Sequence, residues 1–591
     1  MITQRLQELR NEMAKRNVAI YIVPTADFHE SEYVGEHFKA RKFITGFTGS
    51  AGTAVITMTE AGLWTDARYF VQAAEQLKGT TVTLYKMGEE NVPTINEYIE
   101  SIMKDGDTLG FDGRVVNGAW GKQLEELVQK KNGSLKVDED LIDIIWKDRP
   151  ALSKAPVRIL DMQYTGKSVA DKMADVREVM KEKNVKLHIL TSLYDIAWLL
   201  NVRGGDISYV PVVLSYLALS QEECIWFVQE EVLTDELRAY LQENHIVTRP
   251  YNSFYDYVKT IDVDVLMDAS VVNYRISNSI PKNVTICDEA NPTVLMKSIK
   301  NEIELANTRS AHVKDAVAMC KFMYWLKNNV GKIPMTEISA SDYLESLRRE
   351  QDGCFDLSFD TICGYKEHGA IVHYSATKET DVELKPEGLL LVDSGGQYLE
   401  GTTDITRTFA LGPVTDEMKA DFTRVCRSNM NLANAKFLYG CSGINLDILA
   451  RQPLWEANLD YKHGTGHGVG HVLNVHEGPN GFHWGRKGYA TALEAGMVTT
   501  DEPGIYIEGK YGIRLENELI CQKGEKNEFG QFMHFETITY VPIDLDAIEP
   551  SQMNETEKRY LNEYHKAVYE KIAPLLTEKE AEWLKEYTRE I

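Results

Sequence analysis

Two stretches of the first half share one pattern of apolar and polar residues. Residues 9–25 and residues 176–192 each combine apolar residues at helical spacing with a short apolar run. The spacing predicts a helix, and the run predicts a buried strand. The stretches 43–57 and 198–214 also resemble each other, because in each a glycine-containing turn precedes a strand pattern. The sequence therefore predicts two related α/β units with a boundary near 150–156, although chance similarity between helix–strand units is the alternative.

The second half has a different pattern. A boundary is predicted near Asn291–Pro292, and a long charged helix follows over about 298–330. Beyond it, strands punctuated by glycine alternate with helices, which predicts an α+β domain that holds all the unusual polar clusters. The last forty or so residues predict amphipathic helices, which we interpret as a cap or a dimer surface. The expected segments are 1–155, 156–297, 298–545 and 546–591.

Composition agrees with this division and narrows the classes of partner. A chain of 591 residues is too long for one core and predicts about three or four domains. With 43% hydrophobic and 26% charged residues it is typical of a soluble globular protein. The formal charge of -25 argues against nucleic acid or an anionic membrane as a partner, since neither attracts so acidic a surface.

Cysteine usage and the N-terminus bear on the compartment. The eight cysteines are scattered without a CxxC pair, which suits reduced thiols better than a disulfide framework. The N-terminal stretch MITQRLQELRNEMAKRN is charged and amphipathic, unlike a signal peptide. No apolar run approaches the roughly 18 residues of a membrane span. We expect a cytoplasmic protein.

Four carboxylates stand out because they lie in or beside apolar runs. Asp393 and Asp404 are eleven residues apart around a Gly-Gly turn. Glu502 and Glu516 are fourteen apart, in DEPGIY and GIRLENEL. Burying an unpaired charge costs more than packing returns, and no comparable set of Lys and Arg accompanies them. The sequence therefore predicts bound metal as the counter-charge, and four carboxylates balance two divalent ions.

The two aspartates predict a hairpin. Asp393 is expected at the end of one strand and Asp404 inside the next, so that the pair lie roughly opposite with Cβ atoms about 5 Å apart. That separation suits two cations about 3.5–4 Å apart. Taken alone, an aspartate beside a Gly-Gly turn more often shapes the turn.

Histidines are concentrated in HGTGHGVGHVLNVHEGP. It holds His463, His467, His471 and His476, and five of the fourteen histidines fall between 463 and 483. Glycine at alternate positions from 464 to 470 disfavours the helix that spacing of His463 and His467 would otherwise suggest. A glycine-rich segment that brings backbone close to a ligand cluster fits better. The crowding favours a site over separate core histidines, only one histidine need be a ligand, and His471 is given no role.

The run GIRLENEL alternates polar and apolar residues. Period-two alternation places Arg514, Glu516 and Glu518 on one face of a strand. The opposite face holds Leu515 and Leu519. In isolation Glu516 and Arg514 would suggest a plain salt bridge, and Glu518 is interpreted as structural or surface.

Together these motifs resemble the pita-bread metallopeptidases, which include aminopeptidase P, prolidase and methionine aminopeptidase. The resemblance covers about 298–545, through HGTGHGVG, DEPGIY and GIRLEN. GFTGSAG and WTDARYF resemble the creatinase-type N-terminal domain, here in two copies. The fold class implied is α/β and α+β: two creatinase-type domains, a pita-bread catalytic domain and a C-terminal helical extension. That arrangement is similar to the long cytosolic form of aminopeptidase P.

The resemblance implies a role for each matching residue. Asp393 would chelate one metal and His467 with Glu502 the other, while Asp404 and Glu516 would bridge them. The usual metal in the family is manganese, and an oxygen-rich site with one imidazole also suits Co²⁺, Zn²⁺ or Fe²⁺.

Further residues match the substrate side of the family's site. His373, His463 and His476 match its catalytic histidines, and Arg514 fits a role in orienting a ligand carboxylate. Tyr506 is expected to line the site. Glu502 is also expected to move a proton during catalysis.

The activity implied is release of the first residue from peptides with proline second, by a hydroxide that bridges the two metals. A homodimer is implied by the same analogy. Prolidase, which cleaves only dipeptides, is the nearest alternative, and creatinase shares the fold without metals. A non-catalytic peptide-binding module is the alternative of another class, which the complete ligand set disfavours.

Overall fold

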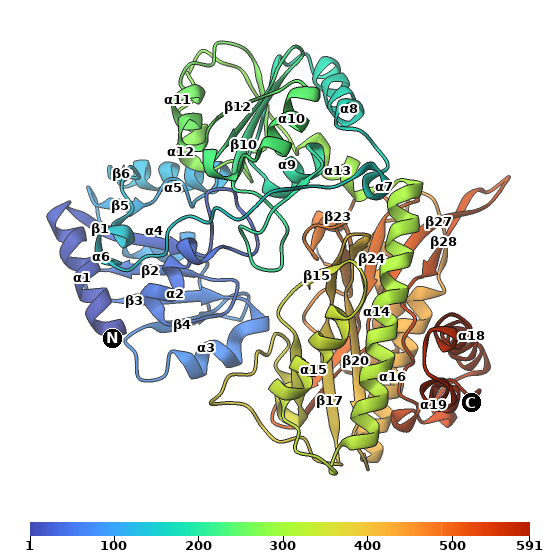
Figure 1. The fold of residues 1–591 in the computed structure, drawn as a ribbon. Helices are drawn as coiled ribbons and strands as arrows, with labels where there is room; N and C mark the ends of the chain where they lie inside the picture. The colour runs from blue at the N-terminus through green and yellow to red at the C-terminus, as the bar shows by residue number, and fades with distance from the viewer. Residues whose placement is uncertain (486) are drawn as a thin grey trace. The chain divides into compact units, whose positions relative to one another are not determined.

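The computed structural model describes residues 1–485 and 487–591 (Figure 1). It divides into two compact units, one of residues 1–160 with 167–293 and the other of residues 161–166 with 294–591. Among the described helices, none combines the length and the apolar character that a membrane crossing requires.

The first unit contains two six-stranded sheets with one topology. Strand β1 pairs antiparallel with β2 and parallel with β5, and β8 pairs in the same way with β10 and β13. The strand orders are β4-β3-β2-β1-β5-β6 and β12-β11-β10-β8-β13-β14. This agreement confirms the predicted repeat. The strands of the first sheet are β1 Val18–Pro24, β2 Thr53–Thr57, β3 Ala61–Thr65, β4 Thr83–Lys86, β5 Thr108–Phe111 and β6 Ser134–Lys136. The strands of the second are β8 Leu187–Leu190, β10 Ser215–Ser220, β11 Cys224–Val228, β12 Ile246–Pro250, β13 Val265–Met267 and β14 Ile286–Asp288.

Corresponding helices also bury corresponding residues. Leu9 and Met13 of α1 (Ile2–Lys15) are buried, as are Val176 and Met180 of α8 (Val169–Glu182). The Ser168 hydroxyl begins α8 by accepting the N–H of Asp171. The remaining helices of this unit are α2 Ala40–Thr45, α3 Phe70–Gln76, α4 Ile95–Ile102, α5 Gly118–Lys130, α6 Leu141–Ile145, α9 Leu193–Leu199, α10 Asp235–Glu243, α11 Phe254–Val258 and α12 Tyr274–Ser277. The short strands β7 Arg158–Ile159 and β9 Val202–Arg203 pair with each other.

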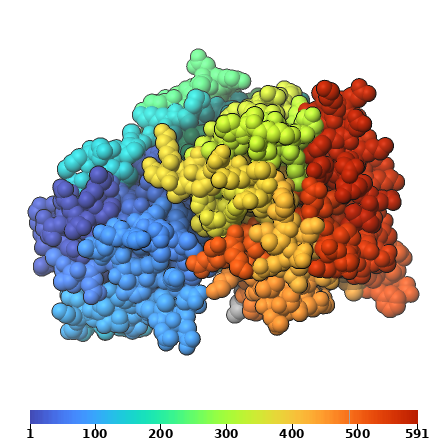
Figure 2. Space-filling model, turned by 90° about the horizontal axis from the view of Figure 1, so that it is seen from below, coloured from blue at the N-terminus to red at the C-terminus, as the bar shows by residue number. Residues whose placement is uncertain are grey.

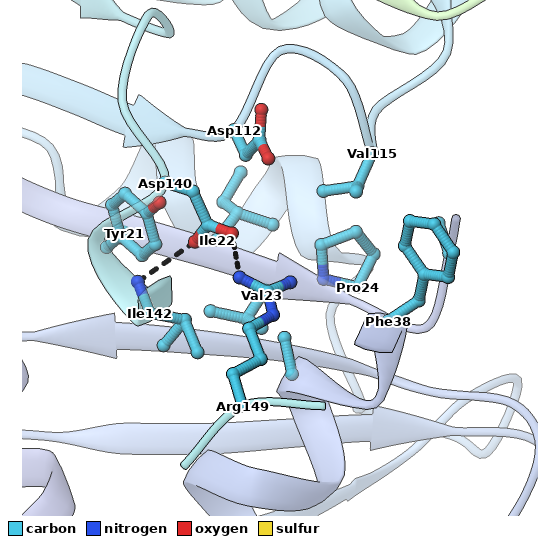
Figure 3. A pocket seen from close by; sticks show the side chains of 12 residues that line it. Tyr21, Ile22, Val23, Pro24, Phe38, Asp112, Val115, Asp140, Ile142 and Arg149 are labelled. Atoms are coloured by element: carbon cyan, nitrogen blue, oxygen red, sulfur yellow. Dashed lines mark hydrogen bonds and ion pairs between the residues drawn. The ribbon is translucent and has the colours of Figure 1, made fainter. Parts of the chain in front are cut away.

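A small cavity of about 20 Å³ lies in the first unit, beside β1 and β5 (Figure 3). Each carboxylate that lines it already has a partner. Asp140 binds Arg149 at 2.6 Å and caps α6, and Asp112 binds Arg114 at 2.9 Å. The volume suits about one water molecule.

The second unit is built on strands that far-apart segments bring together. A three-stranded sheet has the order β16-β17-β20, and a six-stranded sheet has the order β21-β28-β27-β24-β22-β23. Two smaller sheets pair β15-β18-β19 and β25-β26. The strands are β15 Cys354–Leu357, β16 Ile362–Tyr365, β17 Leu389–Ser394, β18 Gly396–Tyr398, β19 Gly401–Thr402, β20 Ile405–Ala410, β21 Lys436–Leu438, β22 Gly466–Gly468, β23 Glu477–Phe482, β24 Val498–Asp501, β25 Gly504–Ile507, β26 Tyr511–Arg514, β27 Asn517–Asn527 and β28 Gly530–Thr537.

Helix α14 (Glu302–Asn329) is the long helix expected over about 298–330. It begins later than expected because Asn301 forms a capping box with Glu304. Its buried residues include apolar side chains and the polar residues Thr308, His312 and Asp315. The other helices of this region are α7 Met162–Thr165, α13 Pro292–Ser298, α15 Glu337–Arg349, α16 Asp416–Ala433 and α17 Gly443–Trp455.

The C-terminal segment is helical, as predicted. Helices α18 (Glu555–Ile572) and α19 (Glu578–Tyr587) pack on α14, and α18 also packs on α16. In the space-filling view these residues, in red, form one side of the surface of the second unit (Figure 2). Their buried residues Leu561, Val568 and Leu584 belong to the same apolar core as β17 and β20.

Candidate metal centre

Asp393 lies near the C-terminal end of β17, and Asp404 directly precedes β20, so both are at the same end of this strand pair. Asp393 lies in β17, and its Cα partner on β20 is Thr406. The expectation that Asp404 lies inside the strand and opposite Asp393 is wrong, because β20 begins at Ile405. The chain between the aspartates forms β18 and β19 of another sheet, so the connection is longer than a hairpin turn. Both side chains are nevertheless buried.

His467 reaches the same place from β22. Its Nε2 lies 3.4 Å from Oδ2 of Asp404, and its Nδ1 is 2.9 Å from its neighbour's carbonyl oxygen, that of Gly468. With Nδ1–H donating to that carbonyl, Nε2 is the nitrogen that faces the carboxylates. A Cβ at Gly466 would lie 1.8 Å from the carbonyl oxygen of Thr500. The segment is therefore a strand in close backbone contact with β24. The glycines predicted a close backbone approach near the ligands, but not which strand would be approached.

Glu502 and Glu516 complete the cluster. Glu502 follows β24, and its Oε1 lies 3.6 Å from Nε2 of His467. Glu516 lies between β26 and β27 and accepts the hydroxyl of Thr406 at 2.7 Å. One potential ligand atom from each of Asp404, His467 and Glu516 lies within 4.8 Å of the others.

The electrostatics of the cluster show a deficit of positive charge. Burial, and then Asp404 and the other neighbouring carboxylates, raises the pKa of Glu516 well above its usual range. Burial raises the pKa of Glu502 to about 7. Burial alone would lower the pKa of His467, but Asp404 and Glu502 raise it to about 9. Protonation is thus the way the metal-free cluster relieves its own repulsion.

Two carboxylate oxygens are left without partners. Oδ1 of Asp393 and Oδ1 of Asp404 are buried and have no hydrogen-bond partner among the described residues. Buried acceptors of this kind are normally satisfied. Oxygen donors with one imidazole suit divalent cations such as Mn²⁺. The residues present therefore fit a pair of bound divalent ions.

Arg514 is the guanidinium of this cluster. It donates to Oδ2 of Asp393 at 2.6 Å and to the hydroxyl of Tyr506 at 2.6 Å. The plain salt bridge to Glu516 that the sequence suggested is replaced by this pairing with Asp393. His463 shares the same hydroxyl, with Nε2 2.8 Å from the Tyr506 oxygen. The structure thus joins Arg514, Tyr506 and His463 into one network beside the carboxylates.

The other histidines have different surroundings. His476 packs edge-on against His467 with ring centroids 4.3 Å apart. His373 is half-buried and follows Val372, whose carbonyl oxygen lies 3.4 Å from Nη2 of Arg514. His471 lies near Thr308 and its Nε2 is 2.9 Å from the carbonyl oxygen of Tyr164, so it tethers α7.

Sequence reasoning missed two residues. Thr406 binds both the carboxylate of Glu516 and, at 3.3 Å, Nε of Arg514. Glu518 is fully buried, so of its two interpretations, structural or surface, the structure supports the structural one. The only signal for Thr406 was its position two residues after Asp404. None pointed to Glu518, because its partners come from distant segments.

Family models match the whole architecture in order. The Creatinase/Prolidase N-terminal domain matches residues 5–143 and again 148–304. Metallopeptidase family M24 matches residues 306–523, and the C-terminal region of that peptidase matches 531–591. These matches confirm the predicted fold class of two creatinase-type domains, a pita-bread domain and a C-terminal region.

Relatives of known name are similar over nearly the full length. The chain is 40% identical to a probable Xaa-Pro aminopeptidase P of Talaromyces marneffei, covering 99% of this chain and 92% of that one. It is 39% identical to a protein of the same name from Aspergillus niger, covering 96% and 95%. The X-prolyl aminopeptidase of Caenorhabditis elegans, described as a cytosolic enzyme with a di-nuclear active site, superposes with a TM-score of 0.95 at 33% identity and covers all of both chains. The chain therefore belongs to metallopeptidase family M24, in the group of the Xaa-Pro aminopeptidases P.

Proposed function

We propose that this protein is an Xaa-Pro aminopeptidase, which hydrolyses the bond between an N-terminal residue and a penultimate proline. The observation that carries the proposal is the meeting of three buried carboxylates, the partly exposed Glu502 and one imidazole around a single guanidinium. Relatives of similar length that carry this activity in their names support it. A proline amide has no N–H, so ordinary peptidases handle it poorly.

The proposed ligands are those of the cluster. Asp393 would hold one ion and His467 with Glu502 the other, while Asp404 and Glu516 bridge. We propose Mn²⁺ as the native metal, and Co²⁺, Zn²⁺ or Fe²⁺ also fit the donors. When bound, such a pair supplies a water of lowered pKa as nucleophile and polarises the scissile carbonyl.

The side chains around the ligands supply orientation and proton transfer. Glu502, whose Oε1 lies 3.6 Å from Nε2 of His467, is the carboxylate that we assign to accept a proton and pass it to the leaving proline nitrogen. Arg514 fixes the Asp393 carboxylate through its 2.6 Å hydrogen bond. Tyr506 and His463 form a hydrogen-bonded pair at 2.8 Å. We assign this pair to the substrate side, together with His373 and His476.

The experiment compares Xaa-Pro-Yaa tripeptides with Xaa-Pro dipeptides after chelation and addition of Mn²⁺. Tripeptide cleavage that disappears in Glu516→Ala supports the aminopeptidase. Cleavage confined to dipeptides would assign the protein to prolidase instead. Tripeptide binding without cleavage of either substrate would leave a peptide-binding module.

We also propose a cytoplasmic homodimer that binds peptides with proline at position 2 and has neither nucleic-acid nor membrane partners. The acidic composition supports the last point, and light scattering gives the mass in solution. The domain limits proposed are 1–155, 156–297, 298–545 and 546–591. Limited proteolysis tests them, because linkers between domains are cut first.

A further inference from the structure

A buried histidine–carboxylate pair lies directly behind Asp404. Glu518 of β27 is 0% exposed, and its Oε1 accepts the backbone N–H of Asp404 at 2.7 Å. His312 of α14, 3% exposed, places Nε2 3.0 Å from the same oxygen. The Nδ1 of His312 is 2.8 Å from the carbonyl oxygen of Thr308. One carboxylate oxygen therefore joins α14, β27 and the segment before β20.

The backbone of Asp404 needs this acceptor. Because Asp404 precedes β20, the register of that strand starts with Ile405 opposite Ser394. The Asp404 amide is thus outside the ladder and its hydrogen bond goes to the Glu518 side chain. A buried N–H left without an acceptor is strongly disfavoured.

The carboxylate of Asp404 has little else to orient it. Its Oδ2 faces His467, whereas Oδ1 has no hydrogen-bond partner among the described residues. The direction of the side chain therefore follows from where its backbone is held. Glu518 holds that backbone, and His312 contacts the same Glu518 oxygen at 3.0 Å, which restricts the position of that side chain.

We propose that Glu518 is a positioning residue of the metal centre, and that His312 supports it. By fixing the Asp404 amide, Glu518 holds the Asp404 carboxylate beside His467. This inference rests on the ligand role proposed for Asp404. Contacts one step behind metal ligands commonly change metal affinity about 10–100-fold when removed.

The test is Mn²⁺ binding to the metal-free full-length protein, measured by isothermal titration calorimetry. The double variant Glu518→Leu/His312→Leu removes both polar side chains, so neither stays buried without the other, while the Asp404 amide loses its acceptor. We expect the Kd of the weaker Mn²⁺ to rise about 10–100-fold. Glu518→Gln retains an oxygen that accepts the amide and is expected to bind Mn²⁺ much as the wild type does.

Glu536→Leu is the matched control. Glu536 of β28 binds Arg309 of α14, the helix that carries His312, at 2.6 and 2.7 Å. Glu536 touches no proposed ligand, so its loss should leave Mn²⁺ affinity unchanged. An unchanged affinity in the double variant would overturn the proposal, and so would an equal loss in the control. A double variant that does not fold without metal would assign the pair to folding and also reject it. A wild type that binds no Mn²⁺ would instead reject the ligand set itself.

Discussion

Asp315 and Glu516 are both buried carboxylates of the second unit, and their surroundings are opposite. Asp315 of α14 receives Nε and Nη2 of Arg348 at 2.7 and 3.1 Å and the hydroxyl of Tyr398 at 2.9 Å. Burial alone would raise the pKa of Asp315, but Arg348 lowers it overall. Glu516 receives a threonine hydroxyl, and burial with neighbouring carboxylates raises its pKa.

The difference separates a carboxylate that stabilises the fold from one that serves a site. Asp315 has its counter-charge within the chain, so the pair is complete in the folded protein. At the candidate centre Arg514 contacts Asp393 but must serve four carboxylates. Perturbed buried acids with too few cations mark functional positions, and here the missing charge has to come from bound ions.

The largest expected effect comes from replacing Glu516, the carboxylate that lacks a counter-charge within the chain. Glu516→Gln keeps an acceptor for Thr406 but removes a charge. We expect kcat/KM for an Xaa-Pro-Yaa peptide to fall about 10³-fold or more, equivalent to about 4 kcal/mol. The metal-free protein should become more stable, because glutamine removes the free-energy cost of protonating Glu516, or of burying it ionised, among the other carboxylates. Activity assays with saturating Mn²⁺ and urea unfolding in EDTA measure the two effects, and a variant that is both active and destabilised would contradict the comparison.

Replacing Asp315, whose charge is balanced by Arg348, should instead lower stability and leave metal affinity unchanged. Asp315→Asn leaves Arg348 buried without its partner, which destabilises by about 3–5 kcal/mol. Urea unfolding of the metal-free protein measures this loss. Because Asp315 touches no proposed ligand, Mn²⁺ affinity at a temperature where the variant is folded should be unchanged. A fall in affinity as large as the fall in stability would show that the two regions are not independent.

The two carboxylate environments also predict opposite pH dependence. The pKa of Glu502 is raised from 4.5 to about 7, so its stabilising contribution is complete below about 4.5. It is lost as pH rises through about 7, a change of about 3 kcal/mol. The pKa of Asp315 is lowered, so its contribution is present above 3.8 and is lost as pH falls.

Unfolding of the metal-free protein at a series of pH values tests the predicted direction of the change in stability with pH. Stability should fall between about pH 4.5 and 7, and Glu502→Gln should flatten that part of the profile. Saturating Mn²⁺ should abolish the fall, because bound cations favour the ionised carboxylate. A wild-type profile that is flat in EDTA would be the contrary result.

Much of the fold could be predicted from periodicity. The helix–strand pattern at 9–25 recurs at 176–192, and the two sheets have one topology. The long helix was predicted because its charged and apolar residues run without a break over about eight turns. Glycine at alternate positions predicted a close backbone approach near the ligand cluster, and a Cβ at Gly466 would indeed have no room beside Thr500.

Only the features of the candidate site that short stretches of sequence determine could be predicted. The ligand residues stand in short motifs, whereas the register that pairs Asp393 with Thr406 depends on β18 and β19. The environment of Glu518 is set by His312, which is more than two hundred residues earlier in the chain. Period-two alternation gives the face of a side chain but not what packs on that face.

The smallest expected effect concerns a buried cation that supports backbone. Arg407 of β20 donates to the carbonyl oxygen of Glu516 at 2.6 Å and to the hydroxyl of Tyr564 in α18 at 2.6 Å. That hydroxyl donates in turn to the carbonyl oxygen of Val541 at 2.6 Å. Tyr564→Phe removes both bonds to the hydroxyl and should lower the free energy of unfolding by about 1–3 kcal/mol. Urea unfolding measures the change.

Tyr560→Phe provides the control, because Tyr560 lies one turn earlier in α18 and is only partly buried. Arg407 retains Glu516, Asn517 and Val541 as acceptors when the Tyr564 hydroxyl is lost. The Glu516 backbone should therefore stay in place, and kcat/KM should remain near that of the wild type. If the fall in kcat/KM for Tyr564→Phe were instead as large as that for Glu516→Gln, the C-terminal helices would be part of the metal centre. The distinction between charge that stabilises the fold and charge that serves the site would then fail at Arg407.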